Sequence, residues 1–224
     1  MQIKFTKKIT DYKYLIMFDL ASKVSGVCLW DLTQNIPIST DKIIVSGELE
    51  LPVAEQYLLI EQYFQKIQTK YHINKEEILV SFEAAPAQIR SGNASTIQTF
   101  IALAKSHAIL DYFLYSNNIA TYDYVGVYPI TTHAFFKQIM GWGKDDKVKK
   151  EDIREYLYKE YHLSDLSLDE SDAVFLAQTL VKSKWNKDIQ EKIREKKRHK
   201  KTLKAPHAIK AIEEEIAFLN DIMN

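Results

Sequence analysis

Short apolar runs alternate with longer stretches of helical spacing over most of this chain. A run such as Tyr14–Phe18, in which nearly every position is apolar, is typical of a strand that is buried on both faces. Apolar positions three and four apart indicate a helix instead. These criteria predict five strands, over residues 14–18, 26–31, 42–49, 78–82 and 120–128. The first three are joined by short polar links, as in an antiparallel meander.

Helices are predicted between and after these strands. They cover residues 52–71, 94–115, 131–140 and 147–161, and a further helix starts near Leu168. The strand at 78–82 is reached through a helix, and such a strand is expected to run parallel to its neighbour through a right-handed crossover. The expected fold class is therefore α/β, with a mixed five-stranded sheet flanked by helices.

The composition is that of a globular protein. The 224 residues are 46% hydrophobic and 12% aromatic, which is enough to build a core of its own. The 30 basic and 30 acidic residues cancel, so the total charge selects no nucleic-acid partner. The lone Cys28 excludes an intramolecular disulfide and a cysteine-rich metal site. No apolar run reaches membrane-spanning length and no signal-peptide core is present, so no membrane association and a cytoplasmic location are expected.

The distribution of charge changes after Leu180. Residues 182–204 hold eleven Lys or Arg and three Asp or Glu. The last segment is predicted to be an amphipathic helix with its apolar residues on one side, namely Ile209, Ile212, Ile216, Leu219 and Met223. Either the acidic residues 213–215 fold back on the basic stretch as a helical hairpin, or the basic stretch is an arm that contacts phosphates. The chain is divided here into a domain over residues 1–181 and a basic helical extension over 182–224.

Isolated acidic residues follow two of the buried strands. Asp19 comes directly after the first strand and Glu83 directly after the fourth. A parallel crossover could bring both to the same edge of the sheet. Asp169 and Asp172 are three residues apart, so both project from one side of the helix start. Each has an ordinary alternative, a turn or cap for Asp19 and the helix dipole for Asp169 and Asp172.

Four carboxylates at one end of a sheet need cations between them. Oxygen-only ligands select hard ions, Mg²⁺ or its substitute Mn²⁺. Two such ions about 4 Å apart activate a water and stabilise the leaving oxygen in phosphodiester cleavage. An acid after the first strand, another after the crossover strand and a pair on a late helix, in this order of strands and helices, favour a ribonuclease H type fold. No nucleophilic serine or cysteine and no zinc-spaced histidine pair is indicated.

A stretch rich in glycine and lysine precedes the helix at 147–161. It reads GWGKDDKVKK over residues 141–150, and its glycines are too few and wrongly spaced for a P-loop. A solvated basic loop is the ordinary alternative to a phosphate-contacting one.

Four motifs in this order resemble those of the RuvC Holliday junction resolvases, within the ribonuclease H-like superfamily. They are Phe18-Asp19-Leu20-Ala21-Ser22 through Gly26, Phe82-Glu83 with the downstream Asn93-Ala94-Ser95, Gly141-Trp142-Gly143-Lys144-Asp145-Asp146-Lys147, and Asp169-Glu170-Ser171-Asp172-Ala173. Together they cover about residues 14 to 180. The resemblance implies a ribonuclease H-like fold, magnesium dependence with two ions per site, and homodimeric action on four-way DNA junctions.

The resemblance also implies roles for particular residues. Asp19, Glu83, Asp169 and Asp172 resemble the metal-binding acids of the family. Lys147 resembles a catalytic lysine near the scissile phosphate, where a cation stabilises developing negative charge. Glu170 is turned away from the metal acids by the helix geometry. The predicted DNA contacts are Arg90, Lys137, Lys144, Lys147, Lys149 and Lys150.

The sequence departs from the family pattern at three places. The loop over residues 84–93 has no aromatic residue, and Ile89 and Arg90 are its bulky members. The glycine that usually follows the first aspartate is replaced, with Ala21 and Ser22 in that region. The basic extension lies outside the family core. These departures resemble bacteriophage members, for which the location would be the host-cell cytoplasm.

Three functions are compatible with these features. The first is a metal-dependent, structure-selective endodeoxyribonuclease that acts as a homodimer on four-way and other branched DNA. The second is a ribonuclease H acting on RNA–DNA hybrids. The third is a non-catalytic architectural DNA-binding protein, which is disfavoured because four clustered acids repel phosphate.

Overall fold

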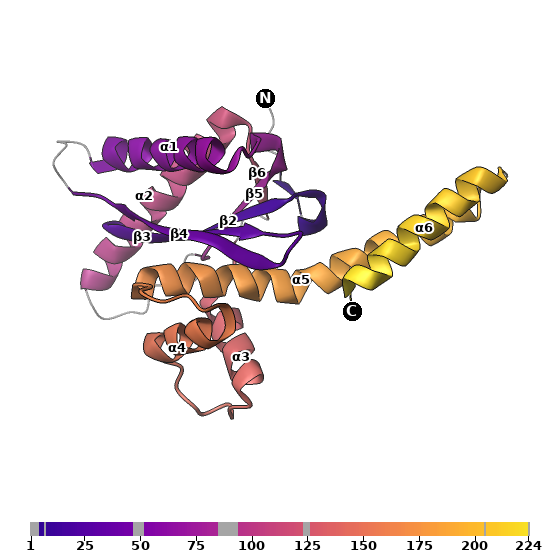
Figure 1. Cartoon of the computed structure of the whole chain (residues 1–224). Coiled ribbons are helices and arrows are strands. Elements are labelled where there is room, and N and C mark those ends of the chain that lie inside the picture. Colours follow the sequence, from indigo (N-terminus) through magenta and orange to yellow (C-terminus); the bar gives the residue numbers. More distant parts are fainter. Residues whose placement is uncertain are drawn as a thin grey trace.

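The chain folds around a central sheet with helices on both faces (Figure 1). The computed structural model describes residues 5–6, 8–46, 52–84, 94–122, 126–203 and 205–223. The strands are β1 (Phe5–Thr6), β2 (Tyr14–Asp19), β3 (Val24–Asp31), β4 (Ile36–Ile44), β5 (Ile78–Phe82) and β6 (Ala120–Tyr122). Within the described ranges they form one six-stranded sheet in the order β1-β6-β5-β2-β3-β4.

The sheet is mixed. Strands β2, β3 and β4 form an antiparallel meander, whereas β5 is parallel to β2, and β6 is parallel to both β5 and β1. This arrangement confirms the predicted mixed sheet flanked by helices. The two-residue strand β1, which the sequence did not predict, adds to the five predicted strands at one edge.

The third strand begins earlier than predicted. Asn35 has a left-handed φ of 58°, which turns the chain at once, so that Ile36 already pairs with Asp31. Its polar residues are tolerated because β4 is an edge strand with one side toward solvent. The predicted strand residues 47–49 and 123–125 lie outside the described residues.

Helices cover both faces of the sheet (Figure 1). One face packs against α1 (Pro52–Tyr71) and α2 (Ala94–Asn117), the other against α3 (Pro129–Met140), α4 (Lys150–Tyr161) and the first half of α5 (Leu168–Lys200). Helix α4 begins three residues later than predicted, because the Lys149 N–H donates to the Asp152 carboxylate at 2.9 Å and makes Lys149 the N-cap residue. No helix in the described ranges has both the length and the apolar character needed to cross a membrane.

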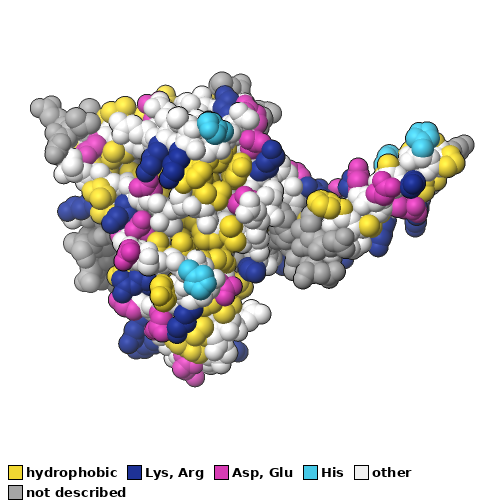
Figure 2. Space-filling model, viewed as in Figure 1, with side chains coloured by type: hydrophobic (Ala, Val, Ile, Leu, Met, Phe, Trp, Pro, Cys, Tyr) yellow, Lys and Arg dark blue, Asp and Glu magenta, His cyan; other side chains and the backbone are white. Residues whose placement is uncertain are grey.

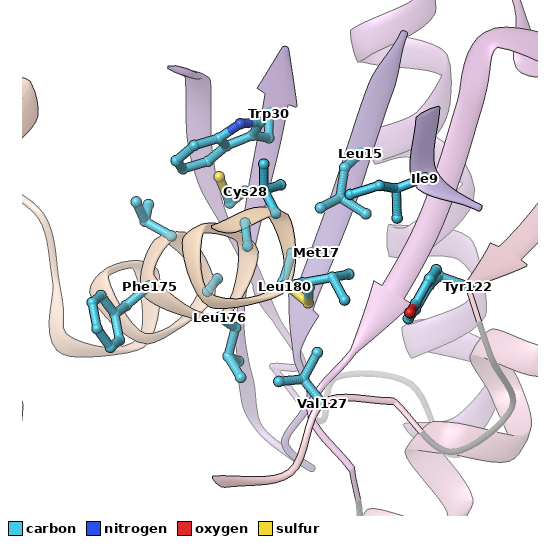
Figure 3. Packing of buried hydrophobic residues seen from close by; sticks show 14 of the residues in the cluster. Ile9, Leu15, Met17, Cys28, Trp30, Tyr122, Val127, Phe175, Leu176 and Leu180 are labelled. Carbon is cyan, nitrogen blue, oxygen red and sulfur yellow. The ribbon is translucent and has the colours of Figure 1, made fainter. Parts of the chain in front are cut away.

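The first half of α5 is enclosed on two sides. Toward the sheet, Leu176 belongs to the same buried cluster as Met17 (Figure 3). Toward the other helices, the ring of Phe175 meets those of Phe136 and Tyr156 edge-on, with centroid distances of 5.4 Å and 5.9 Å. Because packing fixes α5 from both sides, it also fixes the position of the residues at its start.

Helix α5 continues without a break through the boundary predicted between residues 181 and 182. Ile189 and Ile193 are buried, and Asp188 accepts a hydrogen bond of 2.8 Å from the Ile9 N–H, so this part of α5 still packs on the body of the protein. Beyond it, α5 and α6 (Pro206–Met223) form a helical hairpin that projects as an arm (Figure 1). The helical hairpin, one of the two alternatives for the basic stretch, is therefore present, and the ion pairs Lys196–Glu215 and Lys200–Glu213 join its two helices.

Candidate metal centre

The carboxyl ends of β2 and β5 carry the first two acids. The two strands are parallel with Phe18 opposite Phe82, and the Glu83 N–H donates to the Phe18 carbonyl at 2.9 Å. Asp19 ends β2 and Glu83 follows β5 directly. The two carboxyl groups therefore take neighbouring places at one end of the sheet, as the predicted crossover required.

A capping box sets the start of α5. Ser167 is the N-cap residue and accepts from the Glu170 N–H at 3.3 Å, while the Glu170 carboxylate accepts from the Ser167 N–H at 3.1 Å and from its hydroxyl at 2.6 Å. Glu170 also accepts from the Thr40 hydroxyl at 3.2 Å. Its carboxylate is therefore engaged in capping and in a contact with β4, apart from the other acids, as predicted from helix geometry.

Gly26 lets the start of α5 lie directly on the sheet. It pairs with Asp19 across β2 and β3. A Cβ atom at Gly26 would lie 1.9 Å from the Asp169 carbonyl oxygen, so only a glycine leaves room for the helix backbone here. This close approach brings the α5 acids to the strand ends that carry Asp19 and Glu83.

Three of the predicted acids line one cavity. Asp19, Glu83 and Asp172 surround a space of about 360 Å³, whose other lining residues are Pro129, Thr132, His133, Val148, Lys150, Ile153, Phe175 and Leu176. Asp169 is not part of the lining, although its charge acts on both Asp19 and Asp172. Carboxylates from two strands and one helix thus converge on a partly apolar cavity.

Burial and neighbouring negative charge disfavour ionisation of the three carboxyl groups. Burial and the charges of Glu83 and Asp172 raise the pKa of Asp19 to about 8. Burial and the charge of Asp172 also raise the pKa of Glu83, against a hydrogen bond from Asp19 that lowers it. Burial also raises the pKa of Asp172. The acids of the cavity therefore lack enough positive charge around them to ionise normally.

Lys150 supplies positive charge to this cavity. As the first residue of α4 it forms an ion pair with Asp172. Burial lowers the pKa of Lys150, but the contact with Asp172 and the charges of Asp19 and Asp169 outweigh this effect and raise it. The Lys150 side chain remains 53% exposed, so its ammonium group lies at the mouth of the cavity.

The donor chemistry of the cavity fits a hard divalent cation. Its converging groups are carboxylate oxygens, which bind Mg²⁺ or Mn²⁺, and their raised pKa values show that more positive charge would be favourable. Among the described residues, no group of three acidic, histidine or cysteine side chains has the geometry of a formed metal site. Closing the carboxylates around an ion would therefore require their side chains to move.

The predicted basic contacts have different positions. Lys144, Lys147 and Lys149 are exposed in the loop before α4 and do not line the cavity. The Lys137 ammonium donates to the Lys144 carbonyl at 2.5 Å and so ties this loop to α3. Arg90 lies outside the described residues. Of the predicted lysines, Lys150 is the one that enters the cavity.

His133 was not predicted from the sequence. It lies on α3, lines the cavity and lowers the pKa of Asp172. The sequence contains little indication of a role for His133, because it lies in a short helix with no acidic residue within nine positions on either side. Only the packing of α3 against α5 places it opposite the acids.

The strand order, the flanking helices and the acids at the strand ends define an α/β fold of the ribonuclease H-like class. Solved structures of Thermus thermophilus RuvC share this fold. One, in complex with a Holliday junction substrate, matches with a TM-score of 0.52 and 11% sequence identity, over 77% of this chain and 96% of that chain. Another RuvC structure from the same organism matches with a TM-score of 0.50 and 11% identity, over 76% and 95%. No family model and no curated protein sequence matches this chain.

Asp19 should destabilise the metal-free protein above acidic pH. Its folded-state pKa of about 8 is above its ordinary value of 3.8, so the stabilisation present below about pH 4 is lost as the pH rises through 8. Asp19→Asn removes this loss, and we expect it to raise the free energy of unfolding in EDTA by about 1–3 kcal/mol at pH 8 and by less at pH 5. Thermal and urea unfolding at both pH values measures the difference. An Asp19→Asn protein that is no more stable than the wild type at pH 8 would contradict it.

Proposed function

We propose that this chain is a divalent-metal-dependent, structure-selective endodeoxyribonuclease that cleaves phosphodiester bonds in four-way (Holliday) and other branched DNA. The observation that carries the proposal is the convergence of Asp19, Glu83 and Asp172 from β2, β5 and α5 on one cavity. Acids from distant parts of the chain have no structural reason to meet there, since burial and the charge of Asp172 raise the pKa of both Asp19 and Glu83. A site that binds cations and acts on phosphate explains that arrangement.

Asp19, Glu83 and Asp172 would hold Mg²⁺ or Mn²⁺. The negative charge of Asp169, which acts on Asp19 and Asp172, would add to their attraction for the cation. Bound in pairs, such ions supply an activated water and stabilise the leaving oxygen. The residues of the chain itself would position the phosphate group and neutralise part of its charge. Lys150 pairs with Asp172 at the mouth of the cavity, and its ammonium group would be placed to contact a phosphate oxygen that enters there. The apolar side chains of Ile153, Phe175 and Leu176 limit water in the cavity and so strengthen these charge interactions.

The exposed lysines of the loop before α4 extend this positive charge outward. Lys144, Lys147 and Lys149 are exposed and close in sequence to Lys150, so a phosphate backbone that reaches the cavity would meet them. Lys147 retains its proposed role near the scissile phosphate only if DNA binding moves the loop toward the cavity. Arg90 is proposed as a contact on the basis of sequence alone.

Two further properties belong to the proposal. A homodimer would present two symmetric sites to a two-fold substrate. A bacteriophage-type member acting in a host-cell cytoplasm would account for the departures from the family pattern, including the basic extension over residues 182–224. Symmetric paired nicks in a junction, and the mass of the protein in solution by light scattering, test the dimer.

A panel of substrates tests the function. The wild-type protein is incubated with a four-way junction, a flap, a plain duplex and an RNA–DNA hybrid of matched length, in Mg²⁺, in Mn²⁺ and in EDTA. We expect metal-dependent nicks in the branched DNA at least about tenfold faster than in the duplex, a difference of about 1.4 kcal/mol in the barrier. Faster cleavage of the hybrid would assign a ribonuclease H activity instead. Binding without cleavage in either metal would leave the architectural function and refute the proposal.

A further inference from the structure

One helix joins the acids of the candidate metal centre to the projecting arm. Helix α5 carries Asp169 and Asp172 in its first turns and runs without interruption to Lys200, in the hairpin with α6 (Figure 1). We infer that the outward face of this arm binds the backbone of a DNA duplex about one helical turn away from the metal centre. The inference deepens the proposed function and rests on it, since it adds a second contact for the same DNA substrate.

The basic residues of the arm divide into two sets. The first faces other parts of the protein: Lys192 pairs with Asp11 at 2.6 Å and donates to the Thr10 carbonyl at 2.8 Å. Lys196 likewise pairs with Glu215, and Lys200 pairs with Glu213 at 2.5 Å. These three lysines are half-buried and hold the arm together. Folding therefore neutralises only part of the basic stretch.

The second set faces solvent on the projecting arm, where Figure 2 shows several Lys and Arg side chains in dark blue. We call it the basic ridge, and it consists of Arg194, Lys197, Arg198 and Lys201. All four side chains are exposed, and none of them forms an ion pair with an acid in the described part of the chain. The neighbouring Glu195 is already paired with Lys8 at 3.0 Å. Four uncompensated cations on two turns of helix are a favourable surface for phosphates.

The basic ridge lies on the same side of α5 as the metal-centre acids. At about 3.6 residues per turn, the 25 residues from Asp172 to Lys197 make close to seven full turns, so the two side chains point in nearly the same direction. Arg194 and Lys201 lie within about 40° of that direction by the same rule. Arg198 lies about 80° from that direction on the side of Asp169, whereas Lys196 and Lys200, which pair with the α6 acids, lie about 80–120° from it on the opposite side. DNA that approaches Asp172 from this side can therefore reach the ridge.

The spacing along the helix matches the repeat of DNA. With a rise of about 1.5 Å per residue, Lys197 lies about 37 Å along α5 from Asp172. One turn of B-DNA is about 34–36 Å long, so a duplex presents the same strand and face to both points. Because α5 is one continuous hydrogen-bonded helix, this separation is fixed by its length. The helix thus sets a distance between the cleaved bond and a distal backbone contact.

A pair of charge-reversed variants tests the ridge contact. Lys197→Glu with Lys201→Glu changes two ridge residues, and Lys70→Glu with Lys75→Glu is the matched control. Lys70 and Lys75 are exposed lysines that precede β5, at the opposite end of the sheet from the acids. Binding to a 24-base-pair duplex is measured without divalent metal as a function of salt. We expect the ridge variant to bind at least about tenfold more weakly and to lower the slope of log Kd against log salt by about 2, and the control to match the wild type.

Cleavage then separates this inference from the proposed function. On a junction with arms of about 8 base pairs closed by hairpin loops, DNA cannot reach the ridge, and we expect the ridge variant to nick at the wild-type rate. On a junction with arms of 20 base pairs or more, the ridge variant should nick more slowly than the wild type at low enzyme concentration. A wild-type protein that cleaves nothing, combined with a ridge-specific binding defect, refutes the function but supports the inference. Equal binding by the ridge variant and the control refutes the inference alone.

If the double charge reversal unfolds the arm, the variant with Lys197→Gln and Lys201→Gln replaces it in both experiments.

The position of the contact can be mapped directly. Cys28 is buried, so Lys197→Cys provides a uniquely accessible thiol for an iron-chelate cleavage reagent. On a bound junction we expect hydroxyl-radical cuts centred about 10–12 base pairs from the metal-dependent nick, according to the length of α5. Cuts clustered at the branch point, or none above those of the unmodified wild type, would overturn the proposed path of the DNA.

Discussion

Asp172→Asn should abolish metal-dependent nicking of a branched substrate while leaving DNA binding largely intact. The change removes one of the three carboxylates of the cavity and the ion-pair partner of Lys150, but it preserves the shape of the side chain. Loss of metal-based stabilisation is worth several kcal/mol in the transition state, so we expect the rate to fall by about 100- to 1000-fold or more. Asp19→Asn should behave in the same way, because Asp19 lies at the centre of the acid cluster.

Glu170→Gln is the matched control for this prediction. It makes the same chemical change two residues away, and glutamine can still form the capping box with Ser167. We expect its cleavage rate to stay within about threefold of the wild type, since its carboxylate contacts Thr40 and Ser167 and not the cavity. Single-turnover rates in saturating Mg²⁺ compare the three variants with the wild type. Undiminished cleavage by Asp172→Asn or Asp19→Asn would refute the assignment of the site.

Gly26→Ala should reduce cleavage although Gly26 is no acid and contacts no substrate. The added Cβ would stand 1.9 Å from the Asp169 carbonyl oxygen and 2.4 Å from its carbonyl carbon, so the start of α5 must shift outward. A displacement of about 1 Å at catalytic groups can cost on the order of 100-fold in rate. Overpacking of this kind also destabilises a protein by about 1–3 kcal/mol.

Gly143→Ala is the control for the glycine change. Its added Cβ would meet only the flexible Asp146 carboxylate, at 3.3 Å. We expect Gly143→Ala to keep nearly wild-type cleavage and stability, whereas Gly26→Ala loses both. Cleavage is assayed at a temperature at which circular dichroism shows each variant to be folded, so that a loss of rate reports displacement of α5 and not unfolding. Wild-type cleavage by Gly26→Ala would show that the contact of α5 with β3 does not position the acids.

The order of the elements was readable from the sequence because it depends on local periodicity. The helix over residues 52–71 was predicted with its final bounds, since Pro52 and the apolar spacing are both local signals. The start of β4 was predicted too late because Pro37 and the polar residues 39–41 interrupt the apolar pattern of its first half. An edge strand needs little apolar surface, and only the hairpin pairing from Asp31 to Ile36 reveals it.

The candidate site was partly readable for the same reason. An acid directly after a buried strand is visible in the sequence, and the crossover rule placed Asp19 and Glu83 side by side. The separate positions of Lys147 and Lys150 were not visible, because both occur in one lysine-rich stretch. The choice between them depends on where α4 begins, which the hydrogen bond between Lys149 and Asp152 decides.

By itself, the sequence determined most of the strands and helices and the acids at the strand ends, since each follows from the side-chain pattern over a few neighbouring residues. It left the hairpin as one of two alternatives for the extension. Only the tertiary structure decided that Lys150 enters the cavity, that the start of α5 packs against Gly26, and that Lys196 and Lys200 are paired within the arm. These relations join residues that are far apart in the chain or on a long helix. They depend on close packing and on the rotation of the helix, which leave no local mark in the sequence.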